Sequence, residues 1–365
     1  MAIIPFLEDR PAHIDWDAEP PQPAKAFNSP YQHLRGAYPE AWKRLVAMKE
    51  AQERVLGVAA AALARLAREL EDPEDRPNAP SAPLCGTRGG ELPQVQDEPD
   101  VLVAQPRLCI LWKPPGWTMT VASVDDDEED TDATPPLDFD DEQSSGRPLS
   151  SWVASNFGGQ HRIAKDSGMG HGLVHRLDKP TSGPILWARS YEGYHLARLW
   201  VTARRVRKEY VCLCRGWLPR TPCSLRAPLA KVVMPHGPLR TIVAPHGRTA
   251  RTDLLTVDHL LCPHGSPVSL VRVRIHTGRM HQIRAHLAHE GHPLLGDAVY
   301  GGECSSPSWC PRLCLHSCSL GLDIGDGPLV AQVPLPADLR GALAALAPAD
   351  AVASRHQGVW LSDGQ

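Results

Sequence analysis

The chain has 365 residues, which is enough for two or three domains and for a sizeable hydrophobic core. With 42% hydrophobic and 22% charged residues, the composition excludes a largely disordered chain, and no apolar run reaches the roughly 18–20 residues needed to cross a bilayer. Ten Cys are too few for a disulfide scaffold of this length, and the first residues lack the pattern of a secretory signal, so we expect an intracellular protein of unassigned compartment.

The net charge of −4 conceals a strongly basic body. Eleven Asp and Glu, and no Lys or Arg, lie between residues 125 and 142, and without this run the net charge is +7. From Ser151 to Leu320 there are 22 Lys and Arg against 9 Asp and Glu, a charge of +13. Such a surface favours polyanions, and RNA or DNA is the leading class of partner.

The first hundred residues divide into three segments. Residues 1–37 are rich in Pro and lack periodicity, which predicts an N-terminal tail. Apolar residues recur at three- and four-residue spacing from Pro39 to Leu70, which predicts an amphipathic helix over 38–71, packed on the main domain rather than free as an RNA-facing arm. Residues 72–100 predict a linker. We expect the main domain at 101–340 and a C-terminal tail at 341–365.

The main domain is predicted to open with a strand at Arg107–Trp112, which the turn Lys113-Pro114-Pro115-Gly116 ends. The acidic stretch at about 123–147 contains almost nothing apolar and predicts a disordered insertion. The apolar run Pro184–Ala188 then predicts a second strand.

Strands and helices alternate irregularly in the rest of the domain. Ser190 is a candidate N-cap for a helix to about Arg204, and Lys208–Cys214 predicts a strand. Between residues 271 and 276 three aliphatic residues alternate with two Arg and a His, which predicts a strand with one buried and one basic face. A helix is predicted at Arg279–Glu290, with Ile283 and Leu287 on its inner side. This order excludes the regular alternation of a doubly wound sheet.

Two segments carry polar side chains that could act in catalysis or ligand binding. In the run from His175 to Gly183, Asp178 lies in a turn-rich stretch where a carboxylate can face a ligand. In the run from Thr277 to His286, a Gly ends a strand just before a helix, so the first polar side chains of that helix lie where anions are favoured. Taken singly, each segment also fits an ordinary turn with surface cations.

Metal and nucleotide motifs are weak in this sequence. No Gly-rich dinucleotide fingerprint or P-loop occurs. The His residues at 281, 286, 289 and 292 lack the spacing of a helical zinc site, so we expect no metal. A cluster of four Cys contains no Cys-x-x-Cys pair, and packing explains these side chains more simply, although a zinc site stays open: Cys304, Cys310, Cys314 and Cys318.

Four stretches, in this order, resemble the signature segments of the RluA family of RNA pseudouridine synthases: HGLVHRLDKPTSG, RKEYVCLCRG, HTGRMHQIRAHLAHEGHPLLGDAVYGG and RLCLHS. The run LWKPPGW also resembles the early Lys-Pro-x-Gly turn of that family, and the similarity extends over about residues 107–325. It implies an α+β fold with a mixed, largely antiparallel sheet, flanking helices and a central basic cleft. The implied activity is isomerisation of uridine to pseudouridine in RNA, either rRNA or tRNA.

The resemblance also implies roles for individual residues. Asp178 corresponds to the catalytic carboxylate, Arg284 to its guanidinium partner and Tyr210 to the aromatic residue that packs against the target base. Arg176 corresponds to the residue that fills the space left by the flipped uridine. We expect further substrate contacts from polar or glycine residues of the same segments: His175, Thr181, Gly183, Arg279, His281, Gln282 and Lys113.

The implied reaction accounts for these residue types. Isomerisation exchanges a nitrogen–carbon for a carbon–carbon bond without redox change, so no cofactor is expected. One ionised carboxylate suffices, either attacking the anomeric carbon or removing a neighbouring sugar proton. A non-catalytic RNA-binding protein or RNA chaperone with the same fold is the alternative, and a glycosidase is disfavoured because no second catalytic carboxylate is evident. We expect the protein to be a monomer that binds RNA and does not associate with a membrane.

Overall fold

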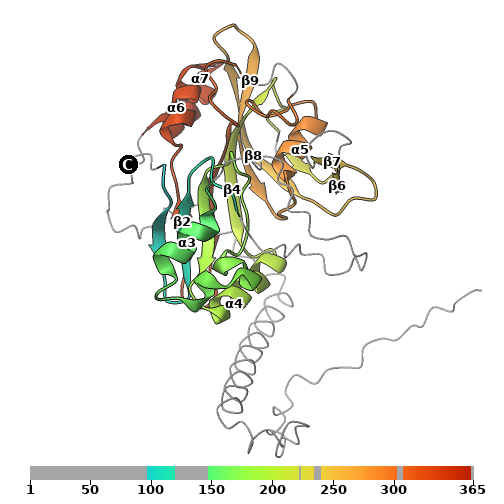
Figure 1. Ribbon diagram of the computed structural model, residues 1–365. Coiled ribbons are helices and arrows are strands. Elements are labelled where there is room, and N and C mark those ends of the chain that lie inside the picture. Colours follow the sequence, from blue (N-terminus) through green and yellow to red (C-terminus); the bar gives the residue numbers. More distant parts are fainter. Residues whose placement is uncertain (1–96, 120–146, 222, 234–239, 302–306, 363–365) are drawn as a thin grey trace, which may run out of the picture. The chain divides into compact units, whose positions relative to one another are not determined.

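A computed structural model describes residues 97–119, 147–221, 223–233, 240–301 and 307–362 (Figure 1). The expected N-terminal tail, the helix at 38–71, the linker up to residue 96 and nearly all of the acidic insertion lie outside these residues. In the part of the chain that is described, no helix has both the length and the apolar character needed to span a membrane.

A three-stranded antiparallel sheet opens the described structure, in the order β1 (Asp100–Ala104), β2 (Leu108–Lys113) and β3 (Gly183–Ala188). The predicted strands β2 and β3 are confirmed within one residue, whereas β1 was not predicted and begins on the last residue assigned to the linker. Both β2 and β3 are buried throughout, because apolar clusters cover both faces of this sheet. Helix α3 (Leu149–Phe157) contributes to one cluster and α4 (Tyr191–Thr202) to the other.

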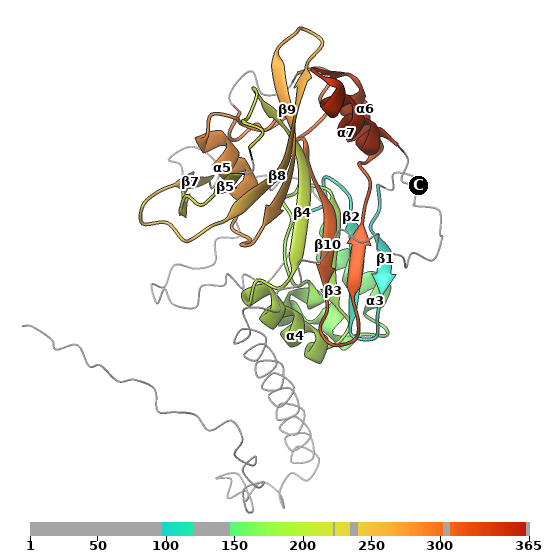
Figure 2. The same ribbon diagram turned by 180° about the vertical axis from the view of Figure 1, so that it is seen from behind.

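The larger sheet has seven strands in the order β11-β10-β4-β9-β8-β12, with β5 also paired to β8, and Figure 2 shows β4, β8 and β9 side by side. All of its ladders are antiparallel. With the helices on its faces, this confirms the predicted α+β fold with a largely antiparallel sheet. The strands are β4 (Arg207–Arg215), β5 (Cys223–Leu225), β8 (Thr252–Leu261), β9 (Pro267–Ile275), β10 (Leu315–Leu322), β11 (Leu329–Gln332) and β12 (Ala347–Pro348).

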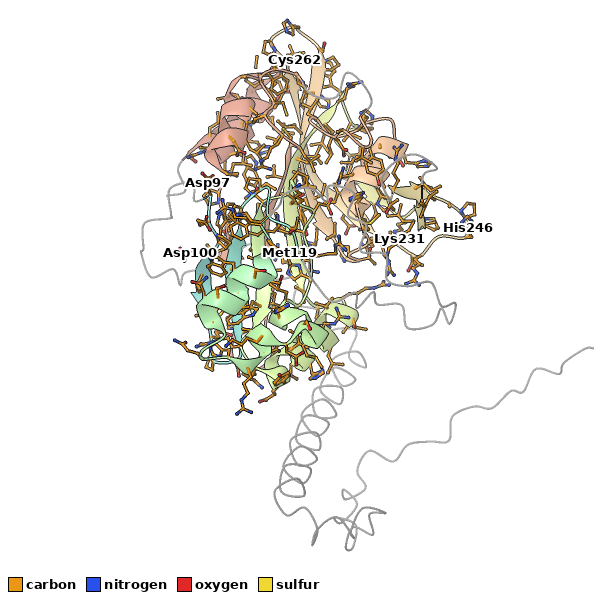
Figure 3. The ribbon with its side chains drawn as sticks, in the orientation of Figure 1. Asp97, Asp100, Met119, Lys231, His246 and Cys262 are labelled. Atoms are coloured by element: carbon orange, nitrogen blue, oxygen red, sulfur yellow. The ribbon has the colours of Figure 1, made fainter. Side chains whose placement is uncertain are left out.

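A separate two-stranded ribbon consists of β6 (Leu229–Val232) and β7 (Arg240–Val243). Lys231 and His246 mark its position in Figure 3. The ribbon lies against α5 (Gln282–His289), with Val243 packed beside the buried Ala285. The helix begins three residues later than predicted, because His281 has left-handed backbone angles (φ 51°) that no α-helical residue adopts.

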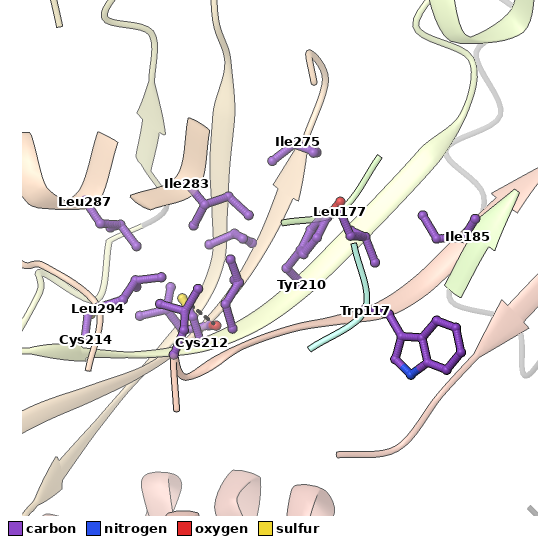
Figure 4. Packing of buried hydrophobic residues seen from close by; sticks show 14 of the residues in the cluster. Trp117, Leu177, Ile185, Tyr210, Cys212, Cys214, Ile275, Ile283, Leu287 and Leu294 are labelled. Carbon is purple, nitrogen blue, oxygen red and sulfur yellow. Dashed lines mark hydrogen bonds between the residues drawn. The ribbon is translucent and has the colours of Figure 1, made fainter. Parts of the chain in front are cut away.

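The two faces of β4 separate two parts of the core. Tyr210 and Cys212 point to the face covered by α5, where Ile283 and Leu287 are buried as predicted (Figure 4). Val211 and its neighbours on the reverse face pack with residues of α6 (Ala337–Ala344) and α7 (Ala351–Leu361). The alternation predicted for the 271–276 segment is confirmed in β9, whose two Arg point to the reverse face and bind the buried Glu209 of β4.

The helix after Ser190 begins as predicted, since the hydroxyl of Ser190 accepts a hydrogen bond from the N–H of Gly193 at 3.1 Å. The C-terminal segment differs from the prediction. Residues 341–365 were expected to be a tail, but they contain β12, which pairs with β8, and α7. Leu343, Leu346 and Ala353 are buried in the apolar cluster on this face of the sheet, and Gln357 donates to the carbonyls of Leu343 and Leu346 at 2.9 Å. Residues 341–362 therefore form part of the folded domain.

Candidate active site

Asp178 lies in the loop that precedes β3. The N–H of Thr181 donates to the carbonyl of Asp178 at 3.0 Å, which closes a tight turn around it. His175, at the start of the loop, accepts a hydrogen bond at Nε2 from the N–H of Leu186 in β3, at 3.1 Å. The first contact therefore tightens the loop at the carboxylate, and the second fixes the start of the loop to the small sheet.

Lys113 supports this loop from inside the protein. Its side chain is 0% exposed, and its ammonium donates to the carbonyls of Pro114, Asp178, Lys179 and Thr181 at 2.8–3.2 Å. A buried ammonium needs such partners to replace water. We predicted Lys113 as a substrate contact, but its burial favours a role in holding the backbone of the Asp178 loop.

The carboxylate of Asp178 faces the guanidinium of Arg284 in α5, whose Nη1 donates to Asp178 Oδ2 at 3.1 Å. Arg284 is only 4% exposed, and its Nε and Nη2 donate to the two oxygens of Asp297 at 2.8 and 2.9 Å. Asp297 is itself fixed by the N–H groups of Val299 and Tyr300, at 3.0 and 3.1 Å. This chain of contacts aims one N–H of Arg284 at Asp178.

The surroundings of Asp178 keep its carboxylate ionised. Burial alone raises the pKa of this carboxyl, but the charges of His281, Arg284 and Arg176, in that order, outweigh it, so the pKa lies below its ordinary value. The Nε2 atom of His281 is 3.9 Å from Asp178 Oδ2. The pKa of Arg284 is raised, because the two carboxylates outweigh its burial. The pair is therefore an anion and a cation at neutral pH.

Tyr210 lies next to this pair on β4. It is 5% exposed and belongs to the same apolar cluster as Leu177, the residue before Asp178 (Figure 4). Burial first, and then the negative charge of Asp178, raise the pKa of the Tyr210 phenol, so this group stays protonated. The predicted trio of Asp178, Tyr210 and Arg284 is thus assembled from three separate segments.

Gln282, which we also predicted as a substrate contact, has its side chain inside the protein. Gln282 is buried and uses all its hydrogen-bonding positions on Thr277, Arg251, Thr252 and the N–H of Arg279, at 2.6–3.1 Å. These contacts join the turn before α5 to β8. Gln282 therefore shapes the site without facing a ligand.

Three further predicted contacts belong to the Asp178 loop. Thr181 is buried, and Gly183 has φ +138° and lets β3 approach β10 closely, since a Cβ there would lie 2.4 Å from the carbonyl oxygen of Ser317. Burial, followed by the charge of Lys208, lowers the pKa of His175 well below its ordinary value, so its ring is neutral. These features favour a role in loop architecture.

The remaining predicted contacts retain accessible surface. Arg176 is exposed beside Asp178, and Arg279 and His281 are partly exposed at the start of α5. Arg279 also donates to the carbonyl of Thr249 at 3.3 Å. Together with the partly exposed His175, these three side chains are the predicted substrate contacts that solvent can still reach.

Sequence reasoning missed Asp297 and Tyr300, although both lie in a quoted motif. The available signal was compositional, because Asp297 is one of only two acidic residues between Arg279 and Tyr300. An isolated Asp in such a basic segment suggests a partner for a cation. Spacing alone does not identify which cation it binds.

Neither a metal-binding group of side chains nor the apolar cavity on β4 lies at Asp178 in the described part of the chain. Among the described residues, no group of three or more His, Cys, Asp and Glu is arranged to hold a metal ion. Cys310 and Cys314 have their sulfur atoms 3.0 Å apart, and Cys304 lies outside the described residues. An apolar cavity lined by Val211 and Leu339 lies on the reverse face of β4, so the predicted basic cleft stays a prediction.

Comparison with known proteins gives a consistent result. The sequence model of a family described as RNA pseudouridylate synthase matches residues 109–289. An uncharacterized RNA pseudouridine synthase of Chloroflexus aurantiacus is 39% identical over 171 residues, covering 46% of this chain and 51% of that protein. Ribosomal large subunit pseudouridine synthase D of Nitrosomonas europaea is 34% identical over 184 residues, covering 48% and 51%.

A third relative, tRNA pseudouridine synthase C of Pasteurella multocida, is 37% identical over 137 residues, covering 35% of this chain and 55% of that protein. The chain thus spans about half the length of the curated relatives it matches. Among solved structures, human RNA pseudouridylate synthase domain containing 1 superimposes with a TM-score of 0.52 at 20% identity, covering 73% of this chain and 96% of that one. This structural likeness establishes the fold.

Proposed function

Residues 109–289 belong to the RNA pseudouridylate synthase family, and from this premise we propose that the chain isomerises uridine to pseudouridine within RNA. The family match confirms the resemblance found in the motifs. The observation that carries the proposal is the carboxylate of Asp178, kept ionised 3.1 Å from a buried guanidinium and beside a protonated phenol. The reaction needs one such carboxylate and an enclosed site.

Each residue of the trio has a chemical task in this proposal. The glycosidic bond from the uracil nitrogen to the sugar breaks, the uracil turns, and its carbon-5 bonds to the same sugar carbon, while carbon-5 releases a proton and the nitrogen gains one. Asp178 either attacks the sugar carbon or removes a neighbouring sugar proton, and both routes require its ionised form. Arg284 maintains that form, and Tyr210 provides a wall for the detached uracil.

The target base must leave its stack to reach Asp178, at a cost of a few kcal/mol. We propose that Arg176 occupies the space that the uridine vacates, because it is exposed immediately beside the carboxylate. The excess of Lys and Arg between Ser151 and Leu320 provides phosphate contacts that offset the cost, so binding should weaken with salt.

We propose rRNA or tRNA as the substrate, since relatives of both descriptions match this chain. The test is release of tritium from RNA labelled at carbon-5 of uridine, with tRNA and large-subunit rRNA transcripts assayed separately. An isomerase releases tritium without strand cleavage or base loss. Binding to both RNAs without release from either would contradict the proposal and favour the non-catalytic RNA-binding protein.

A further inference from the structure

Tyr300 contacts two of the side chains that face Asp178, those of Arg284 and His281. The guanidinium carbon of Arg284 lies 5.2 Å from the centre of the Tyr300 ring, within the range of a cation–π contact. The hydroxyl of Tyr300 is 3.2 Å from Nδ1 of His281, and the two rings meet edge to face at 5.8 Å. Arg284 and His281 are in turn 3.1 and 3.9 Å from the carboxylate of Asp178.

The same hydroxyl is fixed by the β6–β7 ribbon. It donates to the carbonyl of Thr241 at 3.0 Å and accepts from the N–H of Thr241 at 2.9 Å. Its single proton goes to that carbonyl, so in the hydrogen-bond network the Nδ1–H of His281 donates to the Tyr300 oxygen. This arrangement leaves Nε2 of His281 turned toward Asp178.

The main chain of Tyr300 is also held in place. The N–H of Tyr300 donates to Asp297, whose two carboxylate oxygens accept from Nε and Nη2 of Arg284. The ring of Tyr300 has a further neighbour, because the guanidinium carbon of Arg240 in β7 lies 4.9 Å from the ring centre. Tyr300 is therefore connected to α5, to the loop after it and to the ribbon. Its position depends on all three.

We propose that Tyr300 is a positioning residue that holds His281 and Arg284 toward Asp178 and joins them to the β6–β7 ribbon. The inference rests on the proposed function, since its consequence is a faster isomerisation step. Asp297 already binds two nitrogens of Arg284. His281, by contrast, lies just before α5 with left-handed backbone angles, and its Nδ1 contacts the hydroxyl of Tyr300. The hydroxyl should therefore act mainly through His281 and the ring mainly through Arg284.

Two substitutions separate these contributions. Tyr300→Phe keeps the ring and removes the hydroxyl, and Tyr300→Leu removes both. We expect the single-turnover rate to fall about 10-fold in the first variant and about 100-fold in the second, because reacting geometry is sensitive to small displacements. The RNA dissociation constant should stay within about two-fold in both, since Tyr300 contacts protein groups.

Tyr194→Phe is the matched control. Tyr194 is also buried, at 4% exposure, but it lies in α4 within a different apolar cluster. Its variant should keep the wild-type rate within about two-fold. Thermal unfolding of every variant identifies any loss of the fold.

A double-mutant cycle tests the path through His281. In a His281→Ala background, adding Tyr300→Phe should change the rate by no more than about two-fold, because the group it positions is absent. A full 10-fold loss in both backgrounds, or wild-type rates in folded Tyr300→Phe and Tyr300→Leu, would overturn the proposal.

A readout without turnover keeps this inference separate from the proposed function. The ¹⁵N NMR signal of His281 Nδ1 should shift in Tyr300→Phe and remain unchanged in Tyr194→Phe. An unchanged His281 signal in Tyr300→Phe contradicts the positioning role. Absence of tritium release from wild-type protein, with the expected NMR shift, contradicts the proposed function and leaves the contact to His281 supported.

Discussion

The buried ammonium of Lys113 lies 3.2 Å from the main-chain oxygen of Asp178, the residue whose carboxylate faces Arg284. Lys113 belongs to β2 of the small sheet, and Arg284 belongs to α5 against the large sheet. One cation thus binds the backbone of Asp178 and another binds its side chain. The position of this carboxylate therefore depends on how the two sheets pack.

Replacing Lys113 should impair both stability and activity. Lys113→Met leaves three carbonyls of the loop and that of Pro114 without their buried donor, and we expect a loss of about 3 kcal/mol in the free energy of unfolding. The isomerisation rate should fall even in the folded fraction, because Asp178 loses its support. Denaturant unfolding and single-turnover rates measure the two effects. The exposed Lys165→Met is the control, and equal behaviour of both variants would contradict this role.

Asp178→Asn should abolish isomerisation. The amide can neither attack the sugar nor remove a proton, so we expect tritium release to fall by at least about 10³-fold. RNA binding should stay within a few-fold, because one carboxylate contributes little to a largely phosphate-based affinity. Parallel loss of binding and of the near-ultraviolet circular dichroism signal would indicate misfolding instead.

Asp297→Asn should act through Arg284. The change leaves a buried guanidinium with one anionic partner in place of two, and we expect a loss of about 3 kcal/mol in stability. The rate should fall as well, because Arg284 is free to turn from Asp178. Asp253→Asn is the matched control, since Asp253 binds Arg251 through both oxygens on a more exposed part of β8. A rate for Asp297→Asn no lower than that of this control would refute the argument.

His316 should make stability depend on pH. It is 0% exposed, and its ring lies between Ser182 (at Nδ1, 3.0 Å) and the carbonyl of Val333 (at Nε2, 3.3 Å). Burial is the main reason that its pKa falls from 6.5 to about 4. Between these values the unfolded chain binds a proton that the folded protein does not. The His316 contribution is therefore complete above pH 6.5 and declines until pH 4, by about 3 kcal/mol in total.

Unfolding experiments at several pH values check this expectation. His316→Gln should weaken the decline between pH 6.5 and 4, because it removes the proton uptake of the unfolded chain at this position. His289→Gln, at the exposed end of α5, should retain the wild-type decline. If the His316→Gln curve keeps the wild-type slope over this interval, His316 is not the group responsible.

Local sequence patterns predicted the elements that form the site. The apolar runs of β2 and β3, the Ser190 cap of α4 and the alternation in β9 each depend on side chains close together in the sequence. The candidate trio came from ordered motifs, and the structure brings Asp178 and Arg284 together across 106 residues of chain. The C-terminal segment was misjudged because Leu346 and Ala353 gain their burial only against α6 and the large sheet.

The sequence by itself predicted the fold class and the resemblance to a family, because periodicity and motif order are properties of the linear chain. It could not distinguish a polar side chain that faces a ligand from one that supports the backbone. Lys113 and Gln282 suit either role by chemistry, and only tertiary packing placed their polar atoms against carbonyls and amides inside the protein. The partners Asp297 and Tyr300 likewise emerged only from folding, since burial and hydrogen bonding are set by residues distant in sequence.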